Sequence, residues 1–405
     1  MDNNNLKDHR QIGQEQDLFV VSPLVGGGLP MFTPKGFIVR KQIENFIREL
    51  QSPYGYDEVW VPHMAKIDLY KKSGHFEKYP EKFLVKSTVG DEFMLKPVNC
   101  PHHFEIYGSR PRSYRDLPIA YTEFSTTYRD EQSGELNGLL RVRCISVDDC
   151  HIICREDQVF DEIMKVYKTI SGFYEKFNFG VKVRLSLRDP ENSDKYLGDD
   201  AVWERAEDTI RKAAESVTEE KFEGKGEAAI YGPKIDFMIS DSMDREWQMA
   251  TIQLDFIMPE RFDLKYIDAD GKDKRPVVIH RAIAGSLERF IGILIEQYQG
   301  AFPVWLSPTQ AIVIPISDKN LDYGSEVLKQ LKEAGTRAEI DDRSETMQSK
   351  IRDAAAQKIP YMLIVGGREE EQKQVAVRTR SGEDLGAMPL SAFLDKLKEE
   401  IESKG

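Results

Sequence analysis

The stretch from Ser125 to Cys154 constrains the fold of this chain more than any other. It contains two runs with β-strand character, FSTTYRDE and LLRVRCISVDDCHIIC, separated by the segment QSGELNG. Gly134 and Gly138 lie in that segment, and glycine readily adopts the positive φ angles that turns require. Two such runs around a glycine-containing turn are typical of paired strands. We therefore predict an antiparallel hairpin.

Side chains along a strand alternate between its two faces. One face of the second predicted strand would carry Arg141, Arg143, Ile145, Val147, Asp149 and His151, and the first strand would add Arg129 and Glu131. Guanidinium groups at one end, with a carboxylate and an imidazole at the other, could bind an anion beside a cationic or metal-bound group. A solvated sheet face explains the pattern equally well, so this stretch alone leaves both interpretations open.

Length and composition narrow the class of protein. A chain of 405 residues favours two or more domains, each with its own core. Its apolar runs are short and its start is polar, so we expect neither a membrane span nor a targeting peptide, and a location in the cytoplasm. A net charge of -13 argues against a non-specific nucleic-acid binder. The four cysteines lack the spacing of a disulfide framework, so we expect free thiols.

The rest of the chain alternates predicted helices and strands. We predict helices at about 36–50, 157–177, 201–216 and 284–298, and strands at EVWVPHM, VKVRLSL, AAIYGPKIDFMI, REWQMATIQLDFIM and VVIH, the last ending at His280. Pro62 favours an edge position for the first strand. Pro101 predicts a helix start that leaves Cys100 at the amino end, where a thiolate is favoured; a buried free cysteine is the commoner alternative. From about Pro303 the alternation predicts a small α/β domain.

Two candidate zinc sites compete. The local set is Cys144, Cys150, His151 and Cys154, and the dispersed set is Cys100, His151 and His280. Strand alternation turns Cys150 and Cys154 away from His151, and the chain has no C-x-x-C pair, so the local set is disfavoured. The dispersed set would leave one coordination position open, as catalytic zinc sites do. No rule on ligand spacing in the sequence identifies the dispersed set as a zinc site.

Several longer stretches resemble one known family. They include KPVNCPHH, YRDEQSGELNGLLRVR, VDDCHI, YGPKIDF, WQMATIQLDF, IHRAIAGSLERF, PYMLIVGG and VAVRTRSGEDLG, and they run in family order over nearly the whole chain. The chain thus resembles the threonyl-tRNA synthetases, which are class II aminoacyl-tRNA synthetases. The resemblance implies an α+β fold, with an antiparallel sheet flanked by helices in a catalytic domain at 1–302 and a small α/β anticodon-binding domain at 303–405.

The resemblance also implies residue roles. The zinc ligands would be Cys100, His151 and His280, and threonine would contact Asp149, Tyr231, Gln253 and Val147. ATP, entering with Mg²⁺, would contact Arg129, Glu131, Arg141, Ile145, Gln248, Thr251 and Arg289. Catalysis would involve Arg129, Arg289, Lys234 and also His75, which matches a histidine beside the terminal tRNA adenosine; a structural or exposed histidine is the alternative. Glu369 and Arg378 match anticodon-reading positions, for which a surface salt bridge is the alternative.

We therefore expect a threonine-tRNA ligase that acts on tRNA(Thr) as a homodimer, paired through the motif at 36–62. The competing hypothesis is a synthetase-like regulatory or inhibitor-resistance protein with little catalysis. Its support is that Ile145 and Val147 replace an aromatic residue and a glutamine common in the family. The chain begins almost directly with LKDHRQIG, so we expect no editing domain and hence seryl-tRNA formation without its hydrolysis.

Overall fold

The computed structural model describes residues 6–217 and 219–404, which form two compact units. The larger unit comprises Val21–Leu29 and Glu44–Phe290. The smaller unit comprises the segment up to Val20, Pro30–Ile43 and the chain from Ile291 onward. Within the described ranges, no helix combines the length and the apolar character needed to cross a membrane.

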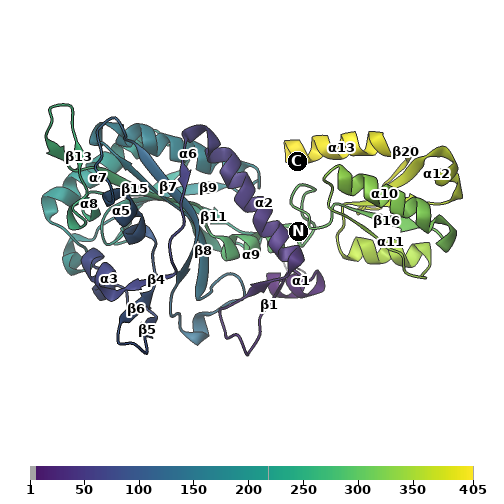
Figure 1. Ribbon diagram of the computed structural model, residues 1–405, viewed down its shortest axis with the longest axis horizontal. Helices are drawn as coiled ribbons and strands as arrows, with labels where there is room; N and C mark the ends of the chain where they lie inside the picture. The colour runs from purple at the N-terminus through teal and green to yellow at the C-terminus, as the bar shows by residue number, and fades with distance from the viewer. Residues whose placement is uncertain (1–5, 218, 405) are drawn as a thin grey trace. The chain divides into compact units, whose positions relative to one another are not determined.

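An eight-stranded sheet forms the centre of the larger unit, in the order β10-β9-β11-β12-β15-β8-β7-β3 (Figure 1). The strands are β3 (Asp57–Glu58), β7 (Ile119–Tyr128), β8 (Cys144–Cys154), β9 (Val181–Leu187), β10 (Lys221–Lys225), β11 (Lys234–Ser240), β12 (Glu246–Asp255) and β15 (Val277–Ser286). All central pairs are antiparallel, and the two edge pairs, β10 with β9 and β3 with β7, are parallel. The predicted antiparallel sheet is therefore confirmed, with parallel strands added at its edges.

Helices cover this sheet, as the prediction required. Helix α6 (Val159–Glu175) contacts β12 and β15, and α7 (Asp200–Glu215) contacts β9, β11 and β12. The predicted apolar face of α6 is buried, because Val159, Ile163, Tyr167, Ile170 and Tyr174 are each at most 8% exposed. At the start of α7, the side chain of Asp199 accepts a hydrogen bond from the Val202 amide, which satisfies one of the free donors of a helix N-terminus. Amphipathic periodicity thus predicted both helices correctly.

Further elements, most of them short, lie in the chain up to Tyr298. These are α1 (His9–Glu15), β1 (Phe19–Val20), β2 (Met31–Phe32), α2 (Pro34–Gln51), β4 (Met64–Lys66), α3 (Ile67–Ser73), α4 (His75–Lys78), β5 (Leu84–Lys86), β6 (Glu92–Leu95), α5 (Cys100–Gly108), α8 (Met258–Arg261), β13 (Tyr266–Ile267), β14 (Asp273–Lys274) and α9 (Leu287–Tyr298). The strand expected at EVWVPHM is wrong in extent: only Asp57–Glu58 joins the large sheet, although it does so at an edge.

The hairpin prediction holds for β7 and β8 but not for LLRVR. β7 and β8 pair from Ile119 with Ile153 to Tyr128 with Cys144, and residues 129–143 form the connection. Leu139 and Leu140 are almost fully buried, so their apolar character reflects packing of this connection and not strand pairing. Arg141 and Arg143 therefore do not extend the face that carries Asp149 and His151.

The smaller unit contains a five-stranded sheet, in the order β17-β16-β18-β19-β20. Its elements are β16 (Ala311–Pro315), α10 (Leu321–Glu333), β17 (Ala338–Ile340), α11 (Met347–Ala356), β18 (Tyr361–Val365), α12 (Gly367–Gln372), β19 (Gln374–Thr379), β20 (Asp384–Pro389) and α13 (Leu390–Ser403). The first three strands are parallel and the last two antiparallel. The predicted α/β alternation is confirmed, with α12 and β20 as additions that its pattern did not reveal.

Candidate active site

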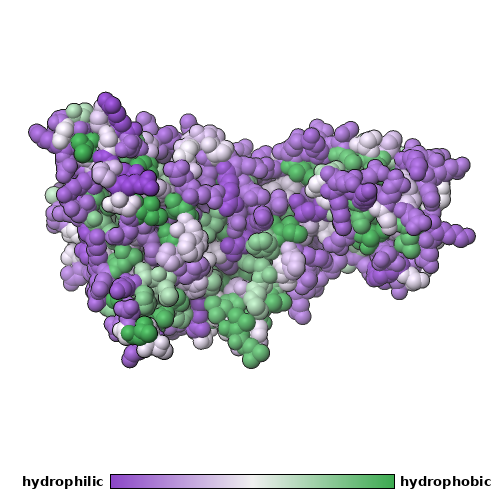
Figure 2. All heavy atoms as spheres, in the orientation of Figure 1, coloured by the Kyte–Doolittle hydropathy of each residue, from purple (hydrophilic) through white to green (hydrophobic). Residues whose placement is uncertain are grey.

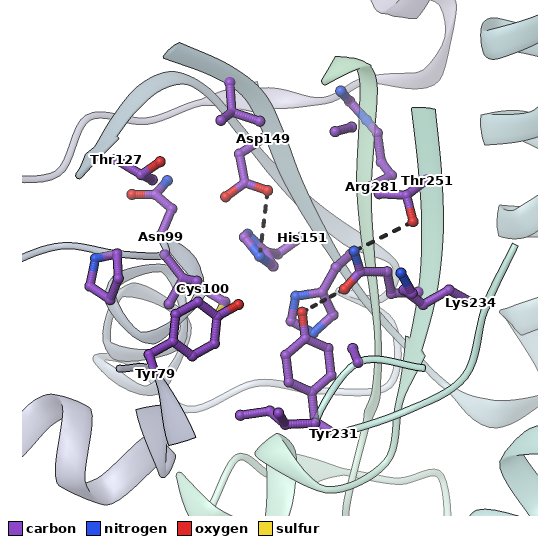
Figure 3. A pocket seen from close by; sticks show the side chains of 18 of the residues that line it. Tyr79, Asn99, Cys100, Thr127, Asp149, His151, Tyr231, Lys234, Thr251 and Arg281 are labelled. Carbon is purple, nitrogen blue, oxygen red and sulfur yellow. Dashed lines mark hydrogen bonds and ion pairs between the residues drawn. The ribbon is translucent and has the colours of Figure 1, made fainter. Parts of the chain in front are cut away.

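A cavity of about 400 Å³ lies against β8, β11, β12 and β15 in the larger unit (Figure 3). Of the residues singled out from the sequence, it is lined by Cys100, Arg129, Val147, Asp149, His151, Tyr231, Lys234, Gln248, Thr251, Gln253 and His280. Val147, Asp149 and His151 alternate on one face of β8, as the strand periodicity predicts. Residues from six separate parts of the sequence therefore meet in one place.

The dispersed cysteine and histidine set forms a cluster in this cavity. The thiol of Cys100 and one ring nitrogen from each of His151 and His280 lie within 4.8 Å of one another, and all three residues are buried. Cys100 is the first residue of α5, and the two histidines are paired across β8 and β15. Sulfur and imidazole nitrogen are the donors that zinc prefers, and three protein ligands are typical of catalytic zinc. The donor set therefore fits zinc.

Each histidine of the cluster is held through its other nitrogen. Nε2 of His280 lies 2.9 Å from a carboxylate oxygen of Asp255, so Nδ1 is left to face the cluster. Nδ1 of His151 lies 2.8 Å from Nδ1 of His103, which leaves Nε2. Partners of this kind fix the tautomer and the ring orientation of metal-binding histidines. Burial, together with the neighbouring His280 and His103, lowers the pKa of His151 well below its usual value, so its ring is neutral at pH 7.

Cys100 is buried, which agrees with the alternative of a buried free cysteine at the start of α5. Burial raises the pKa of the Cys100 thiol well above its usual value, and the carboxylates of Asp149 and Asp255 raise it further. The position at the start of α5 does not offset these effects. Burial outweighs a helix end because the charged form loses its hydration.

A second carboxylate organises the polar side of the cavity. Lys234, Gln248 and Thr251 all donate hydrogen bonds to Asp236, which is fully buried on β11. The hydroxyl of Tyr231 donates to Gln253 at 2.6 Å, and the Tyr231 ring stacks on His280 with centroids 4.5 Å apart. The polar residues of β11 and β12 therefore connect to the metal-type cluster through Tyr231.

The arginines expected to bind phosphate do not all line the cavity. Arg129 does, and its guanidinium lies over the Tyr79 ring, 5.7 Å from the centroid. Arg289 instead donates to the Leu140 carbonyl at 2.9 Å and lies over the Trp247 ring. The guanidinium of Arg141 forms an ion pair with the carboxylate of Glu131, with 2.7 Å between Nη2 and Oε2.

Ile145 and His75 also lie outside the lining of the cavity. Ile145 is half-buried opposite Thr127 on β7. His75 begins α4 and is fully buried, so the exposed alternative is wrong. Its Nδ1 lies 2.8 Å from the Ser73 hydroxyl, its Nε2 has no hydrogen-bond partner among the described residues, and its ring lies beside Tyr231. Burial, helped by nearby cationic groups, lowers the pKa of His75 to about 3.

Glu369 and Arg378 lie in the smaller unit. Glu369 accepts a hydrogen bond from the Gly366 amide at 3.0 Å and so caps α12. Arg378 forms an exposed ion pair with Asp384 at 3.3 Å, which is the arrangement that the surface alternative anticipated.

Sequence reasoning missed the supporting residues His103, Glu123, Asp236 and Asp255. A signal existed for Asp255, since Thr251, Gln253 and Asp255 are two apart on one strand and share a face. A carboxylate inside the otherwise apolar run KIDFMI was the corresponding signal for Asp236.

Comparison with known proteins agrees with this architecture. Residues 83–298 match the family model described as the tRNA synthetase class II core domain (G, H, P, S and T), and residues 310–400 match that of the anticodon binding domain. The chain therefore belongs to the class II tRNA synthetases, as the sequence resemblance implied.

Within this family, the chain is similar to proteins named threonine--tRNA ligase. The one from Chloroherpeton thalassium is 52% identical over 98% of this chain, and the one from Deinococcus deserti is 49% identical over 98%. The chain spans 62% and 61% of the lengths of these two relatives. The solved RNA binding domain of threonyl-tRNA synthetase from Cryptosporidium parvum superposes with a TM-score of 0.92 at 35% identity, covering 97% of this chain and 98% of that one.

Proposed function

We propose that this chain is a threonine-tRNA ligase. It would condense threonine with ATP to threonyl-adenylate and transfer the threonyl group to the 3′ end of tRNA(Thr). The observation that carries the proposal is that a single cavity contains the Cys100, His151 and His280 cluster, Asp149, and the cationic Arg129 and Lys234. The similarity to threonine--tRNA ligases supports it and does not favour the regulatory or inhibitor-resistance alternative.

Activation is attack by the threonine carboxylate on the α-phosphate of ATP, with a carboxyl–phosphate bond formed and pyrophosphate released. Negative charge spreads over the phosphoryl oxygens during this displacement, so fixed cations accelerate it. Arg129 and Lys234 are two of the cationic side chains that line the cavity, and Arg289, outside its lining, is the third that we assign to this step. Mg²⁺ would enter with ATP and neutralise charge on the phosphates.

Zinc would be held by Cys100, His151 and His280. When bound, it would supply a Lewis acid that recognises the amino and hydroxyl groups of threonine. Asp149 would accept a hydrogen bond from the threonine amino group, while Tyr231, Gln253 and Val147 would form the remaining walls. Because valine offers a methyl group in place of the hydroxyl, such a site would reject valine strongly.

The nucleoside of ATP would contact Gln248 and Thr251 on one side and Glu131 and Ile145 on the other, and Arg141 would contact the outer phosphate. Glu131 and Arg141 bind each other in the present state, so ATP would have to replace that ion pair. Ile145 offers apolar contact to the adenine but no aromatic stacking. His75, with a free ring nitrogen beside Tyr231, would receive the terminal adenosine of tRNA.

We assign residues 1–302 to the catalytic domain and 303–405 to the anticodon-binding domain. In the latter, Arg378 would exchange Asp384 for a base edge, and Glu369 would read a base from the start of α12. Both residues already have protein partners, so base reading would compete with those contacts.

We further propose a cytoplasmic homodimer formed through the region at 36–62. Exposed apolar side chains support this: Trp60 is 73% exposed, and Leu24 in the loop between β1 and β2 is 99% exposed. Figure 2 shows hydrophobic side chains gathered over that loop. Burial of such side chains is a main source of the stability of permanent dimers.

Threonine-dependent exchange of pyrophosphate into ATP tests the proposed activity most directly. We expect exchange with threonine, much weaker exchange with serine and none with valine. Charging of tRNA(Thr) would then test transfer. Binding of threonine or tRNA without exchange would favour the regulatory alternative.

A further inference from the structure

Asp236 has no assigned contact with a substrate, yet its carboxylate is surrounded by hydrogen-bond donors. The residue is 0% exposed at the middle of the large sheet. One oxygen accepts from Ser186 Oγ at 2.7 Å, Lys234 Nζ at 2.9 Å and Arg184 Nη2 at 3.1 Å, and the other accepts from Thr251 Oγ1 at 2.8 Å and Gln248 Nε2 at 2.9 Å. Five donors from three strands therefore converge on one buried charge.

We propose that Asp236 is the positioning residue of the cavity: it fixes where Lys234, Gln248 and Thr251 point, and it sets the direction of the hydrogen bonds that reach Tyr231. This inference rests on the proposed function, because those side chains are the ones assigned to ATP and threonine. Asp236 itself would touch neither substrate.

The orientation of the Gln248 amide follows from its two partners. Its Nε2 donates to Asp236, and its Oε1 accepts from Arg184 Nη2 at 2.8 Å. A flipped amide would point its amino group at the guanidinium and its carbonyl at the carboxylate, losing both bonds. Gln248 can therefore offer a substrate one further N–H and one further lone pair in fixed places.

The same argument fixes which group donates and which accepts in a chain of hydrogen bonds across the cavity. Because the Thr251 hydroxyl donates to Asp236, its oxygen is free to accept from Gln253 Nε2 at 3.4 Å. The Gln253 carbonyl oxygen then accepts from the Tyr231 hydroxyl at 2.6 Å. Every proton in the chain therefore points toward Asp236, and the Tyr231 oxygen is left as a pure acceptor.

Asp236→Asn is the informative change, since an amide keeps the shape but not the chemistry. Whichever way it turns, its amino group meets either the three donors on one side or the two on the other. We expect kcat/KM for ATP in pyrophosphate exchange to fall about 100-fold, with a raised KM for ATP, which is the effect of losing one fixed donor to a developing charge. Glu162→Gln, which alters a buried carboxylate on α6 outside the cavity, is the control and should retain activity.

A double-mutant cycle separates positioning from loss of folding. If Asp236 acts by orienting Thr251, then Thr251→Val should reduce kcat/KM by about tenfold in the wild type and less than twofold in Asp236→Asn. Ser186→Ala is a milder second variant, because Ser186 touches Asp236 and Arg184 but does not line the cavity; we expect about a threefold loss. If the Asp236→Asn chain does not fold, a second double-mutant cycle that combines Ser186→Ala with Thr251→Val replaces the first.

The outcomes distinguish the two hypotheses. A wild-type chain without threonine-dependent exchange would refute the proposed function. Wild-type exchange together with an unimpaired Asp236→Asn enzyme, or with fully additive effects in the cycle, would refute the positioning role alone.

Discussion

Glu123 on β7 provides the sharpest stability prediction. Its side chain is 7% exposed and accepts hydrogen bonds from the Val61 amide at 3.0 Å and from Asn99 at 2.7 Å, and it lies 3.8 Å from the Nζ of the buried Lys96. Glu123→Gln keeps the size of the side chain but removes the charge that Lys96 faces. We expect a large loss of stability, because removing one member of a buried ion pair leaves the other uncompensated.

The magnitude follows from the pKa of this carboxyl. Burial favours its neutral form, but hydrogen bonds from His103, Val61 and Asn99, with the charge of Lys96, lower the pKa of Glu123 from 4.5 to about 2. At 1.36 kcal/mol for each pH unit, this interval corresponds to about 3 kcal/mol of unfolding free energy. Breaking a buried ion pair costs about 3 to 5 kcal/mol in other proteins, so two independent arguments agree.

The pH dependence has a definite sign. Because the folded-state pKa is depressed, the stabilisation is complete above pH 4.5 and is lost as the pH falls toward 2. Glutamine mimics the protonated carboxyl, so the difference between wild type and Glu123→Gln should be about 3 kcal/mol at pH 7 and should narrow steadily below pH 5.

Urea denaturation followed by far-UV circular dichroism at a series of pH values measures this difference. Glu58→Gln is the matched control, because Glu58 forms an exposed ion pair with Arg48 at 2.6 Å and should contribute less than about 1 kcal/mol. A Glu123→Gln difference below 1 kcal/mol at pH 7, or one that does not change with pH, would refute the reasoning.

Three further predictions concern zinc and tRNA. Cys100→Ser and His280→Ala should each lose bound zinc in metal analysis, whereas Cys150→Ser, which turns away from the cavity, should keep it; the reverse result would restore the local cysteine set. Asp255→Asn should weaken zinc binding about 10- to 100-fold in a chelator competition, since it replaces the charged acceptor of the His280 ring by an amide whose one oxygen is needed by the Ile257 and Met258 amides, and unchanged affinity would contradict that role. Arg378→Ala should weaken charging of tRNA(Thr) by about 1 to 3 kcal/mol while adenylate formation stays intact, and equal charging of wild-type and anticodon-mutant tRNA would exclude base reading.

Hydrophobic periodicity predicted the long elements that bury one face and expose the other. Helix α6 and strand β9 follow their apolar patterns closely, because each buries one face against its neighbours. The strand expected to end at His280 continues to Ser286, since β8 remains beside it and pairs Ala282 with Asp149 and Ser286 with Val147. Pairing with a partner distant in the sequence extended this strand, and a local pattern carries no information about such a partner.

The sequence predicted the residues of the candidate site that would contact substrate or metal. It did not predict the residues that only hold those side chains in place. The metal-type set Cys100, His151 and His280 was recognised, although only the fold brings it within 4.8 Å. Glu123 was not, because only the donors that surround this carboxylate identify its role, and for Asp236 the sequence held only the signal of a carboxylate within an apolar run. The burial that raises the pKa of Cys100 was equally invisible, since it depends on packing from several segments.

The division of β8 into two faces has a consequence for how the sequence of this chain can change. Ser146, Asp148, Cys150, Ile152 and Cys154 are each at most 3% exposed, whereas Val147, Asp149 and His151 face the cavity. Substitution along this strand should therefore affect folding and chemistry at alternate positions. Inserting a single residue before Val147 would exchange the two sets, placing hydrophilic side chains in the core and apolar ones in the cavity. Variation in length should consequently be confined to the connection at 129–143, where no such register exists.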